Sequence, residues 1–538
     1  MKTKLILASM LALAMLAGCK KEPGTTVSGG SHDMAYISVV VKTPSATGTR
    51  AGSAETNASA EEAAIKTLYA VTYDANNNLV HYKDKDPAQA ITGFDTDGAS
   101  TTQKSKAFCI PSTAKKLLLV ANPGTKLKDA LDAAAKGDSF DVLNAAIADV
   151  TNVAELGSDA DGYAMINQGM SVAADTNDDD AADLCLIDIS GKISLIGDGA
   201  GQFKTELLAQ ANAEDDNNRI GVKIERLAAK IVFSSGITDA TPGEKVLPAN
   251  TAIFTFGGWA LDAVNTTYYP WAKKVDLASS PSTTAFYARN FYTIDPNYDN
   301  ETGLKYCHVD PATYANDAAF LTADAMVYCL ENTMRAGEQK FKNATRVVLR
   351  GAYYPDQAWT DDWFSYNGTT YQDIAALQAA YGLAAADSKL RNACEKFYTA
   401  IADYADAQDP KITLTGNDFA SLTTEDLEKI PNGGELVKED DCVRWYQDGL
   451  CYYWYEIRHD DAVTVDMGFG KYGIVRNNWY ALTLSKVNGP GTPWYPGVDP
   501  KDPGGDVDPE DPIDETAGYI GVTVEIGPWV KWDHSVEV

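Results

Sequence analysis

The sequence has little positive charge for its size. Its 538 residues include 45 Lys and Arg against 75 Asp and Glu, which gives a formal net charge of −30. Nucleic acids and anionic membrane surfaces both bind clustered Lys and Arg side chains, and no such cluster occurs along the chain. The composition therefore argues against nucleic acid and anionic membrane surfaces as partners, and it indicates a soluble chain whose negative charges repel one another.

Residue patterns for catalysis are also missing. The five histidines lie far apart, and none of the motifs H-x-x-x-H, H-E-x-x-H and G-x-S-x-G occurs. With 75 acidic residues, some carboxylate pair will lie at the glycosidase spacing by chance, so the acids alone identify no active site. We expect no enzyme activity and no catalytic residue.

Two ligand-binding motifs are incomplete. Residues 468–473 read G-x-G-x-x-G, but the residues after them are β-branched and aromatic, which predicts a hairpin instead of the helix that a dinucleotide site needs. Asp175–Asp179 begins like a calcium loop, yet Asp180 and Leu186 stand where that loop needs Gly and Glu. The sequence therefore predicts no cofactor and no metal.

The eight cysteines include no C-x-x-C pair. Seven of them follow Cys19 at dispersed positions, namely Cys109, Cys185, Cys307, Cys329, Cys394, Cys442 and Cys451. This spacing fits neither a disulfide framework nor a zinc site, so most are expected to be small buried hydrophobes. A bond between Cys442 and Cys451 across a hairpin stays open.

The N-terminal part of the chain contains a long apolar run, from Leu5 to Ala17, which follows two lysines. It is too short to span a membrane and is typical of a signal peptide. The run ends Leu-Ala-Gly-Cys19, which resembles a bacterial lipobox. We therefore expect residues 1–18 to be removed and Cys19 to be lipidated, so that the precursor is held at a membrane.

Arginine is rare in the first part of the chain. Arg50 is the first arginine and Arg219 the next. Arg50 lies in a loop of small residues that follows a strand-like run from Ala35 to Val41, in which Ile37, Val39 and Val41 alternate onto one face. An isolated, accessible arginine of this kind is a candidate protease site, with the cut between Arg50 and Ala51.

The rest of the chain reads as mainly β, with 28 Tyr and 10 Trp. Short strands are predicted at 68–73, 79–82 and 116–121, and a strand pair at 184–189 and 193–196. Helical patches are predicted at 127–135 and 140–150, and an inserted Ala-rich helical region at 374–404. A second run of strands begins at Val222, after a polar stretch at 212–218 that favours a domain boundary.

This pattern gives five segments. They are a signal peptide (1–18), a propeptide with an N-terminal strand (19–50), an N-terminal β domain (51–218), a C-terminal β domain (219–495), and an acidic Pro/Gly spacer with a final strand (496–538).

The N-terminal strand and the end of the chain share one pattern. Tyr36-Ile-Ser-Val-Val-Val41 matches Tyr519-Ile-Gly-Val-Thr-Val524, and both strands stop near a proline. Cutting after Arg50 would release the first strand and leave unpaired backbone groups in an open groove. The C-terminal strand of the next molecule would fill that groove head-to-tail and build a fibre. The proposed donor residues are Tyr519, Ile520, Val522, Val524, Ile526 and Trp529.

Several segments carry a resemblance to a known family. They are the lipobox with the Arg50 loop, Lys116–Pro123, Glu225–Ile231, Tyr328–Thr333, Ile457–His459 with Lys471–Tyr480, and the ending with Pro528–Trp529. On these residues the chain resembles the fimbrillins of Bacteroidales, the type V pilus subunits, and within them most closely the stalk subunit of the short, minor fimbria.

The resemblance implies a fold, a processing route and a location. The fold would be two transthyretin-like β-sandwich domains in tandem, with small helical insertions and a C-terminal donor strand. The subunit would be exported as a lipoprotein to the outer membrane, cut after Arg50 by an arginine-specific protease, and polymerised with other copies and other pilus subunits by donor-strand exchange. The fibre would serve adhesion to a host or bacterial receptor and biofilm formation.

Other functions remain open on the sequence. A surface lipoprotein that binds glycans through exposed aromatic residues would keep residues 35–41 in its own sheet and stay monomeric. A tip or anchor adhesin would share the domains of the stalk subunit. A secreted hydrolase has no residue constellation behind it.

Overall fold

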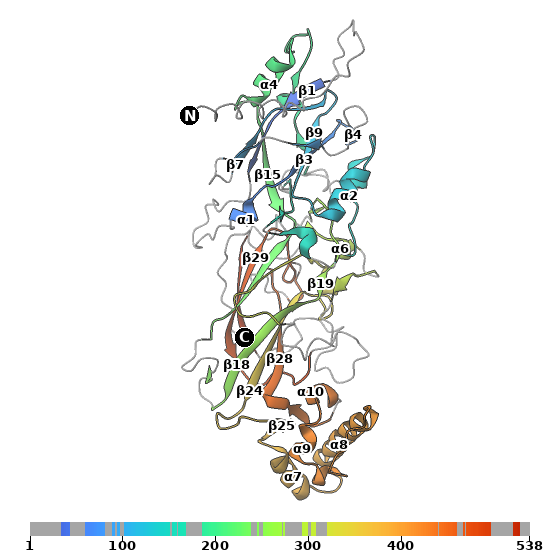
Figure 1. Cartoon of the computed structure of the whole chain (residues 1–538), viewed down its shortest axis with the longest axis vertical. Coiled ribbons are helices and arrows are strands. Elements are labelled where there is room, and N and C mark those ends of the chain that lie inside the picture. The colour runs from blue at the N-terminus through green and yellow to red at the C-terminus, as the bar shows by residue number, and fades with distance from the viewer. Residues whose placement is uncertain are drawn as a thin grey trace, which may run out of the picture.

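The computed structural model describes two β units stacked along the long axis of the molecule, with a helical insertion at one end (Figure 1). The residues described are 34–42, 60–80, 89–91, 94–96, 102–150, 153–158, 160–167, 185–237, 245–246, 251–271, 273–274, 293–299, 303–307, 320–438, 441–459, 466–468, 470–495 and 520–527. Strands outnumber helices in both units, so the expected mainly β class is confirmed.

The N-terminal unit is built around a sheet with the strand order β4-β3-β9-β12-β15-β2-β7-β6, to which β13 and β5 add at β9 and β3. The strands are β2 (Val39–Lys42), β3 (Leu68–Tyr73), β4 (Leu79–Val80), β5 (Gln89–Ala90), β6 (Phe94–Thr96), β7 (Thr102–Ser105), β9 (Lys116–Ala121), β12 (Met165–Asn167), β13 (Ile187–Asp188) and β15 (Ile220–Arg226). A short sheet of β14 (Ser194–Leu195), β1 (Met34–Ile37) and β8 (Phe108–Pro111) continues from it.

Alternation along β9 separates two cores in this unit. Leu118 and Val120 pack with the helices α2 (Thr125–Ala133) and α3 (Phe140–Leu143), whereas Leu117 and Leu119 face a second core that includes β1 and β2. Successive side chains of a strand point to opposite faces, so a strand covered on both sides reads as a continuous apolar run. The run Lys116–Ala121 is such a strand.

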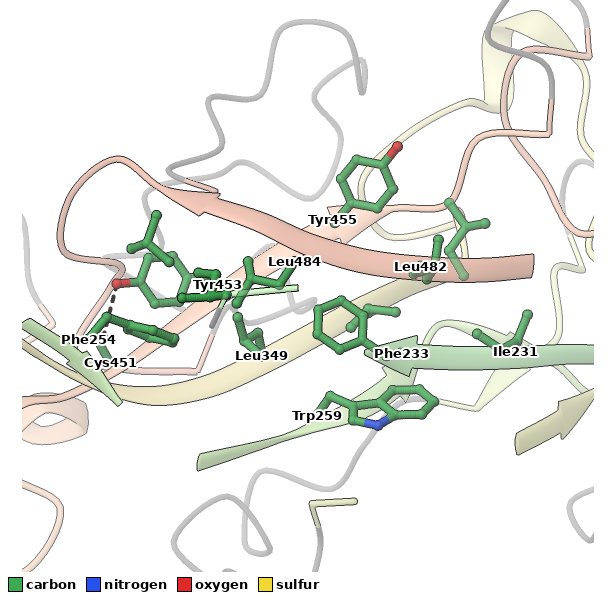
Figure 2. Packing of buried hydrophobic residues seen from close by; sticks show 14 of the residues in the cluster. Ile231, Phe233, Phe254, Trp259, Leu349, Cys451, Tyr453, Tyr455, Leu482 and Leu484 are labelled. Carbon is green, nitrogen blue, oxygen red and sulfur yellow. Dashed lines mark hydrogen bonds between the residues drawn. The ribbon is translucent and has the colours of Figure 1, made fainter. Parts of the chain in front are cut away.

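The C-terminal unit is a β-sandwich. One sheet has the order β23-β16-β29-β30 and the other β17-β18-β24-β28. The bounds are β16 (Ala229–Ser235), β17 (Lys245–Val246), β18 (Ile253–Asp262), β23 (Met326–Cys329), β24 (Arg346–Tyr354), β28 (Leu450–Glu456), β29 (Trp479–Val487) and β30 (Ile520–Gly527). Figure 2 shows Phe233 and Leu482 of the first sheet packed against Trp259 and Leu349 of the second.

The helical insertion has its own core. Helices α7 (Ile374–Leu383), α8 (Lys389–Ala407), α9 (Thr424–Leu427) and α10 (Gly433–Leu436) pack with the small sheet of β25 (Trp363–Tyr366), β26 (Thr369–Tyr371) and β27 (Arg444–Tyr446). The expected helical region at 374–404 is therefore two helices, each with a side-chain N-cap, from Asp373 and Ser388. They lie at the end of the molecule away from α4 (Glu206–Glu214) (Figure 1).

Three sequence expectations need correction. The strand pair at 184–189 and 193–196 does not form, because β13 pairs with β9 and β14 pairs with β1. The helical patch at 140–150 gives a single turn, α3. The sheet of the N-terminal unit continues past the expected boundary at residue 218, since β15 pairs with β12 and β2, and the chain enters the second sandwich only after Arg226.

No helix in the described part of the chain is long and apolar enough to cross a membrane. Residues 1–33 lie outside the described residues, and with them the expected signal peptide and the expected lipidation site Cys19.

Candidate assembly interface

The N-terminal strand, residues 34–42, uses both of its hydrogen-bonding edges. Its first half, β1, pairs antiparallel with β14 and with β8. Its second half, β2, pairs parallel with β15 and antiparallel with β7. The break between the halves is Ser38, whose carbonyl accepts the amide of Ile220 at 2.9 Å. Removal of this strand would leave unpaired backbone groups on both neighbours.

The side chains of the strand alternate as the sequence predicted. Ile37, Val39 and Val41 are fully buried and face one core together with Ala35. Each large aliphatic side chain buried in this way contributes about 1.5–3 kcal/mol. The prediction that these three residues share one face is confirmed, and the strand is an integral part of the core.

Tyr36 points the other way, towards α4. It is 1% exposed and packs against Cys109, Ala209 and Ala213. Its hydroxyl donates to the carboxylate of Glu206. The two alanines are one helical turn apart, and their small side chains let α4 lie close to the strand.

We call residues 206–219 the strap, because they cross the N-terminal strand and contact both of its neighbours. On one side Glu214 accepts the amide of Ala107 at 2.8 Å, and on the other Asn212 donates to the Ser194 hydroxyl at 2.9 Å. Arg219 donates to the carbonyl of Ser105 at 2.7 Å. These contacts do not involve the N-terminal strand, so they would hold the strap in place without it.

The strap also contacts the strand at Ser38. The Ser38 hydroxyl donates to the carbonyl of Ala213 at 2.6 Å and accepts from the Arg219 guanidinium at 3.2 Å. Ser38 is fully buried, so these two bonds satisfy its hydroxyl. The polar stretch at 212–218 favoured a domain boundary on sequence grounds, and nothing in it predicted contact with the N-terminal strand. The only available signal was Thr205, which caps α4 by accepting the Leu208 amide.

The C-terminal strand β30 lies beside β29 in the sandwich of the C-terminal unit. The pairing is antiparallel, from Trp479 opposite Gly527 to Val487 opposite Ile520, with a bulge between Leu484 and Lys486. Within the described residues, β30 is the last strand of its sheet and has β29 as its only neighbour. Four of the predicted donor residues, Ile520, Val522, Val524 and Ile526, lie at alternate positions on it.

The other predicted site residues lie outside the described part of the structure. They are Cys19, Arg50, Ala51, Tyr519 and Trp529. The described chain ends at Lys42 before the expected cut and resumes after it at Ala60, where α1 (Ala60–Ala63) begins.

Helix α1 ties the start of this second segment to both units. The Glu62 carboxylate accepts from Lys230 of β16 at 2.7 Å and from the hydroxyl of Tyr328 of β23. Its carbonyl accepts from the guanidinium of Arg226, the last residue of β15, at 3.0 Å. Burial lowers the pKa of Arg226 to about 10. This group of buried charges was not visible in the sequence.

In the part of the chain that the structure describes, the metal and nucleotide motifs weighed above are not completed. Among the described residues no group of His, Cys, Asp and Glu is arranged to hold a metal. The glycine motif at 468–473 leads into strand β29 and not into a helix, with Asn477 at a positive φ of 59° in the turn between them. The calcium-like loop at 175–179 lies outside the described residues. None of the seven cysteines after Cys19, all of them in the described residues, forms a disulfide, so Cys442 and Cys451 are not joined.

Two buried titratable groups have structural roles. Burial raises the pKa of Asp295 to about 8, although its carboxylate accepts the amides of Thr333 and Asn297, both at 2.7 Å. Burial lowers the pKa of His459 to about 4, and its Nδ1 lies 2.8 Å from the Tyr480 hydroxyl. Both residues are at most 5% exposed, which suits a core position better than contact with a substrate.

Two segments of the chain match models of protein families. Residues 35–184 match the major fimbrial subunit protein (FimA), and residues 444–535 match the major fimbrial subunit protein type IV, Fimbrillin, C-terminal. The first segment begins within β1, and the second contains both β29 and β30. No curated protein matches the chain.

The solved structures that match the chain include the following three, among others. A candidate cell adhesion protein from Parabacteroides distasonis is 13% identical, with 93% of this chain and 100% of that chain covered and a TM-score of 0.42. A fimbrilin from Porphyromonas gingivalis is 13% identical, with coverages of 93% and 98% and a TM-score of 0.37. The tip fimbrial protein from the same organism, truncated at its C-terminus, is 11% identical, with coverages of 84% and 95% and a TM-score of 0.31.

Proposed function

We propose that this protein is a fimbrial subunit that polymerises by exchanging its N-terminal strand for the C-terminal strand of a second copy. The fibre would be displayed at the cell surface, act in adhesion, and contain the protein as a stalk subunit of the short-fimbria type. The protein would have no enzymatic activity. The observation that carries the proposal is the two-edged pairing of residues 34–42 inside a sheet most of whose strands lie in a segment matching a major fimbrial subunit.

The position of the N-terminal strand in the chain favours its replacement by another strand over its permanent retention in the sheet. The strand is joined to the rest of the unit only through residues 43–59, which contain Arg50. A cut after Arg50 would separate it covalently from every neighbour with which it pairs. The freed strand would then be held by non-covalent contacts alone, and an equivalent strand that buries the same apolar face can replace it.

The C-terminal strand cannot serve both sheets at once. In the groove it would pair along both edges, as β2 does with β15 and β7. In its own sheet one edge is already paired with β29. A strand has only two hydrogen-bonding edges, so β30 must leave β29 before it donates.

The N-terminal segment gives the proposed route to the surface. Lipidated Cys19 would hold the precursor at the outer membrane, and the cut after Arg50 would detach the subunit from that lipid. The cutting enzyme would be an arginine-specific protease, since Arg50 is the only arginine before Arg219. The assembled fibre would bind a receptor on a host cell or on another bacterium.

The test uses purified precursor treated with a trypsin-class protease. We expect the first cut after Arg50, a new N-terminus at Ala51, and the growth of oligomers that dissociate only on strong heating. An Arg50→Ala precursor should remain monomeric under the same treatment, and so should a chain that lacks residues 519–538. Oligomers of equal size from the chain without residues 519–538 would contradict donation by the C-terminal strand.

A further inference from the structure

The strap restricts which side chains a strand packed against it can carry at two positions. At the Tyr36 position the small side chains of Ala209 and Ala213 leave room for a ring, and the carboxylate of Glu206 accepts a hydrogen bond. That combination fits a tyrosine, whose ring fills the space above the alanines while its hydroxyl reaches the acid.

The position two residues further along admits only a small side chain. Ser38 is fully buried between the carbonyl of Ala213 and the guanidinium of Arg219, at 2.6 and 3.2 Å from its hydroxyl oxygen. A larger side chain would have to displace Arg219, which is also bonded to the carbonyl of Ser105 and paired with Asp216 at 3.2 Å. Serine or glycine fits without such a change.

The remaining positions repeat the alternation of the core. Ile37, Val39 and Val41 are fully buried, whereas Val40 between them is partly exposed. The groove therefore accepts the pattern Tyr-Ile-small-Val-x-Val, in which x tolerates a polar side chain.

This pattern occurs twice in the sequence, at residues 36–41 and at residues 519–524. In the second copy Gly521 takes the small position and Thr523 the half-exposed one. A shift by two residues would bring Gly521 to the tyrosine position and Thr523 to the small position. A shift by one would turn the apolar residues to the wrong face.

We propose that the strap fixes the register of strand exchange, by seating Tyr519 of the incoming copy where Tyr36 lay and Gly521 where Ser38 lay. Glu206 accepts the Tyr519 hydroxyl, and Arg219 lies over Gly521. This inference rests on the proposed function, but it adds the alignment of the two molecules and the residues that select it. Glu206 and Arg219 are positioning residues for the exchange.

A native cysteine can report the register. Cys109 lies directly opposite Tyr36 in the antiparallel pairing of β1 with β8 and is 4% exposed. Residues opposite each other in such a pair have Cβ atoms about 4.5–5.5 Å apart, close to the spacing that a disulfide needs. In the proposed register, Cys109 of one copy therefore lies opposite Tyr519 of the next.

The experiment compares Tyr519→Cys, Gly521→Cys and Thr523→Cys, whose side chains share one face of the donor strand. Each variant is made in the full chain with Cys307→Ser, because Cys307 is exposed. The chains are cut after Arg50, allowed to polymerise, oxidised with copper phenanthroline and separated by non-reducing denaturing electrophoresis. Uncut Tyr36→Cys chain is the positive control, and it should form an intramolecular bond with Cys109.

We expect reducible dimers and higher multimers from Tyr519→Cys only, and their loss when Cys109→Ser is added. If Gly521→Cys or Thr523→Cys gave cross-linked multimers and Tyr519→Cys gave none, the proposed register would be wrong, although strand exchange itself would still hold. Failure of the chain with native Tyr519 to polymerise after the cut would instead refute the proposed function.

A second measurement decides the matter if the Tyr519→Cys chain does not polymerise. Tyr519→Phe and Glu206→Gln each weaken one hydrogen bond and keep the shape of the side chain. Both polymers should dissociate at a lower temperature than the native one, and the double variant no lower than either single variant. Thr523→Val is the matched control, with little change expected. Additive effects of Tyr519→Phe and Glu206→Gln would show that the two residues do not meet.

Discussion

Glu62 and Lys230 form a buried ion pair that joins the two β units, with 2.7 Å between the carboxylate and the ammonium. Their side chains are 2% and 10% exposed, and Tyr328 donates a further hydrogen bond to the same carboxylate. Lys230 also lies over the ring of Trp479, with 5.0 Å between the ammonium and the ring centroid. The short helix that carries Glu62 is thus a structural link between the units, close in sequence to the expected cut.

Replacing Glu62 with alanine should destabilise the chain strongly. The change leaves Lys230 buried without its carboxylate, and breaking a buried pair of this kind costs about 3–5 kcal/mol. Denaturant unfolding of the precursor measures the loss. Asp406→Ala is the matched control, because Asp406 pairs with Lys411 at 2.6 Å on the exposed surface, and such a pair is worth about 0–1 kcal/mol. Equal effects of the two changes would contradict the structural link.

Weakening the N-terminal strand should affect the precursor and spare the fibre. Ile37→Ala removes a fully buried side chain, which lowers the free energy of unfolding of the uncut chain by about 2–5 kcal/mol. Under the proposed strand exchange this strand is absent from the assembled subunit, so the dissociation temperature of the polymer should not change. Val40→Ala, at a half-exposed position of the same strand, should have a small effect on both. A polymer weakened as much as the precursor would mean that the strand is retained.

Acid should destabilise the native chain through His459. Burial lowers its folded-state pKa to about 4, below the ordinary value of 6.5, so the unfolded chain binds the proton first as the pH falls. The free energy of unfolding therefore contains the full contribution of His459 above about pH 6.5. It falls by roughly 3 kcal/mol as the pH is lowered from about 6.5 to 4. His459→Gln keeps a hydrogen-bonding group near Tyr480 and removes the titration. Unfolding free energies at pH 7, 5.5 and 4 should fall more steeply for the native chain, and parallel curves would refute this role.

Two glycine positions should respond in opposite directions. A Cβ on Gly491 would lie 2.0 Å from the carbonyl oxygen of Tyr452, so Gly491→Ala requires backbone movement and should cost about 1–3 kcal/mol. A Cβ on Gly382 in α7 would meet nothing within 4 Å, and Gly382→Ala should stabilise the helix by about 0.5–1 kcal/mol. Thermal unfolding of the two variants checks both signs. A stabilising Gly491→Ala would contradict the close approach.

Local patterns in the sequence predicted local structure well. The strands β3 and β9 begin and end where the apolar runs do, at Leu68–Tyr73 and Lys116–Ala121, because each run is bounded by turn residues. The shared face of Ile37, Val39 and Val41 also followed from alternation alone. These features depend on neighbouring residues.

Features that depend on distant residues could not be predicted in this way. The parallel pairing of β2 with β15 joins Val39 to Ile220, and nothing in either segment specifies the other. The strap includes the stretch 212–218 that favours a domain boundary on sequence, since Asn and Asp residues are typical of turns, although here they bond to the N-terminal strand's neighbours. The buried partners of Glu62 lie in two of the segments that carry the family resemblance, Glu225–Ile231 and Tyr328–Thr333, but nothing local in these segments shows that they meet Glu62.

If subunits assemble by the proposed strand exchange, the pairing of β30 with β29 sets a minimum subunit concentration for assembly. The two strands belong to one chain, joined through residues 488–519, so each presents the other with an effective concentration of the order of millimolar. A groove on a separate subunit present at about micromolar concentration would compete at a disadvantage of roughly a thousandfold, or about 4 kcal/mol. Pairing in the groove, along two edges instead of one, must exceed pairing with β29 by at least that amount before a fibre grows. Under the proposed exchange, the fold would therefore keep the subunit monomeric at low concentration, and fibre growth would depend steeply on the concentration of cut subunits.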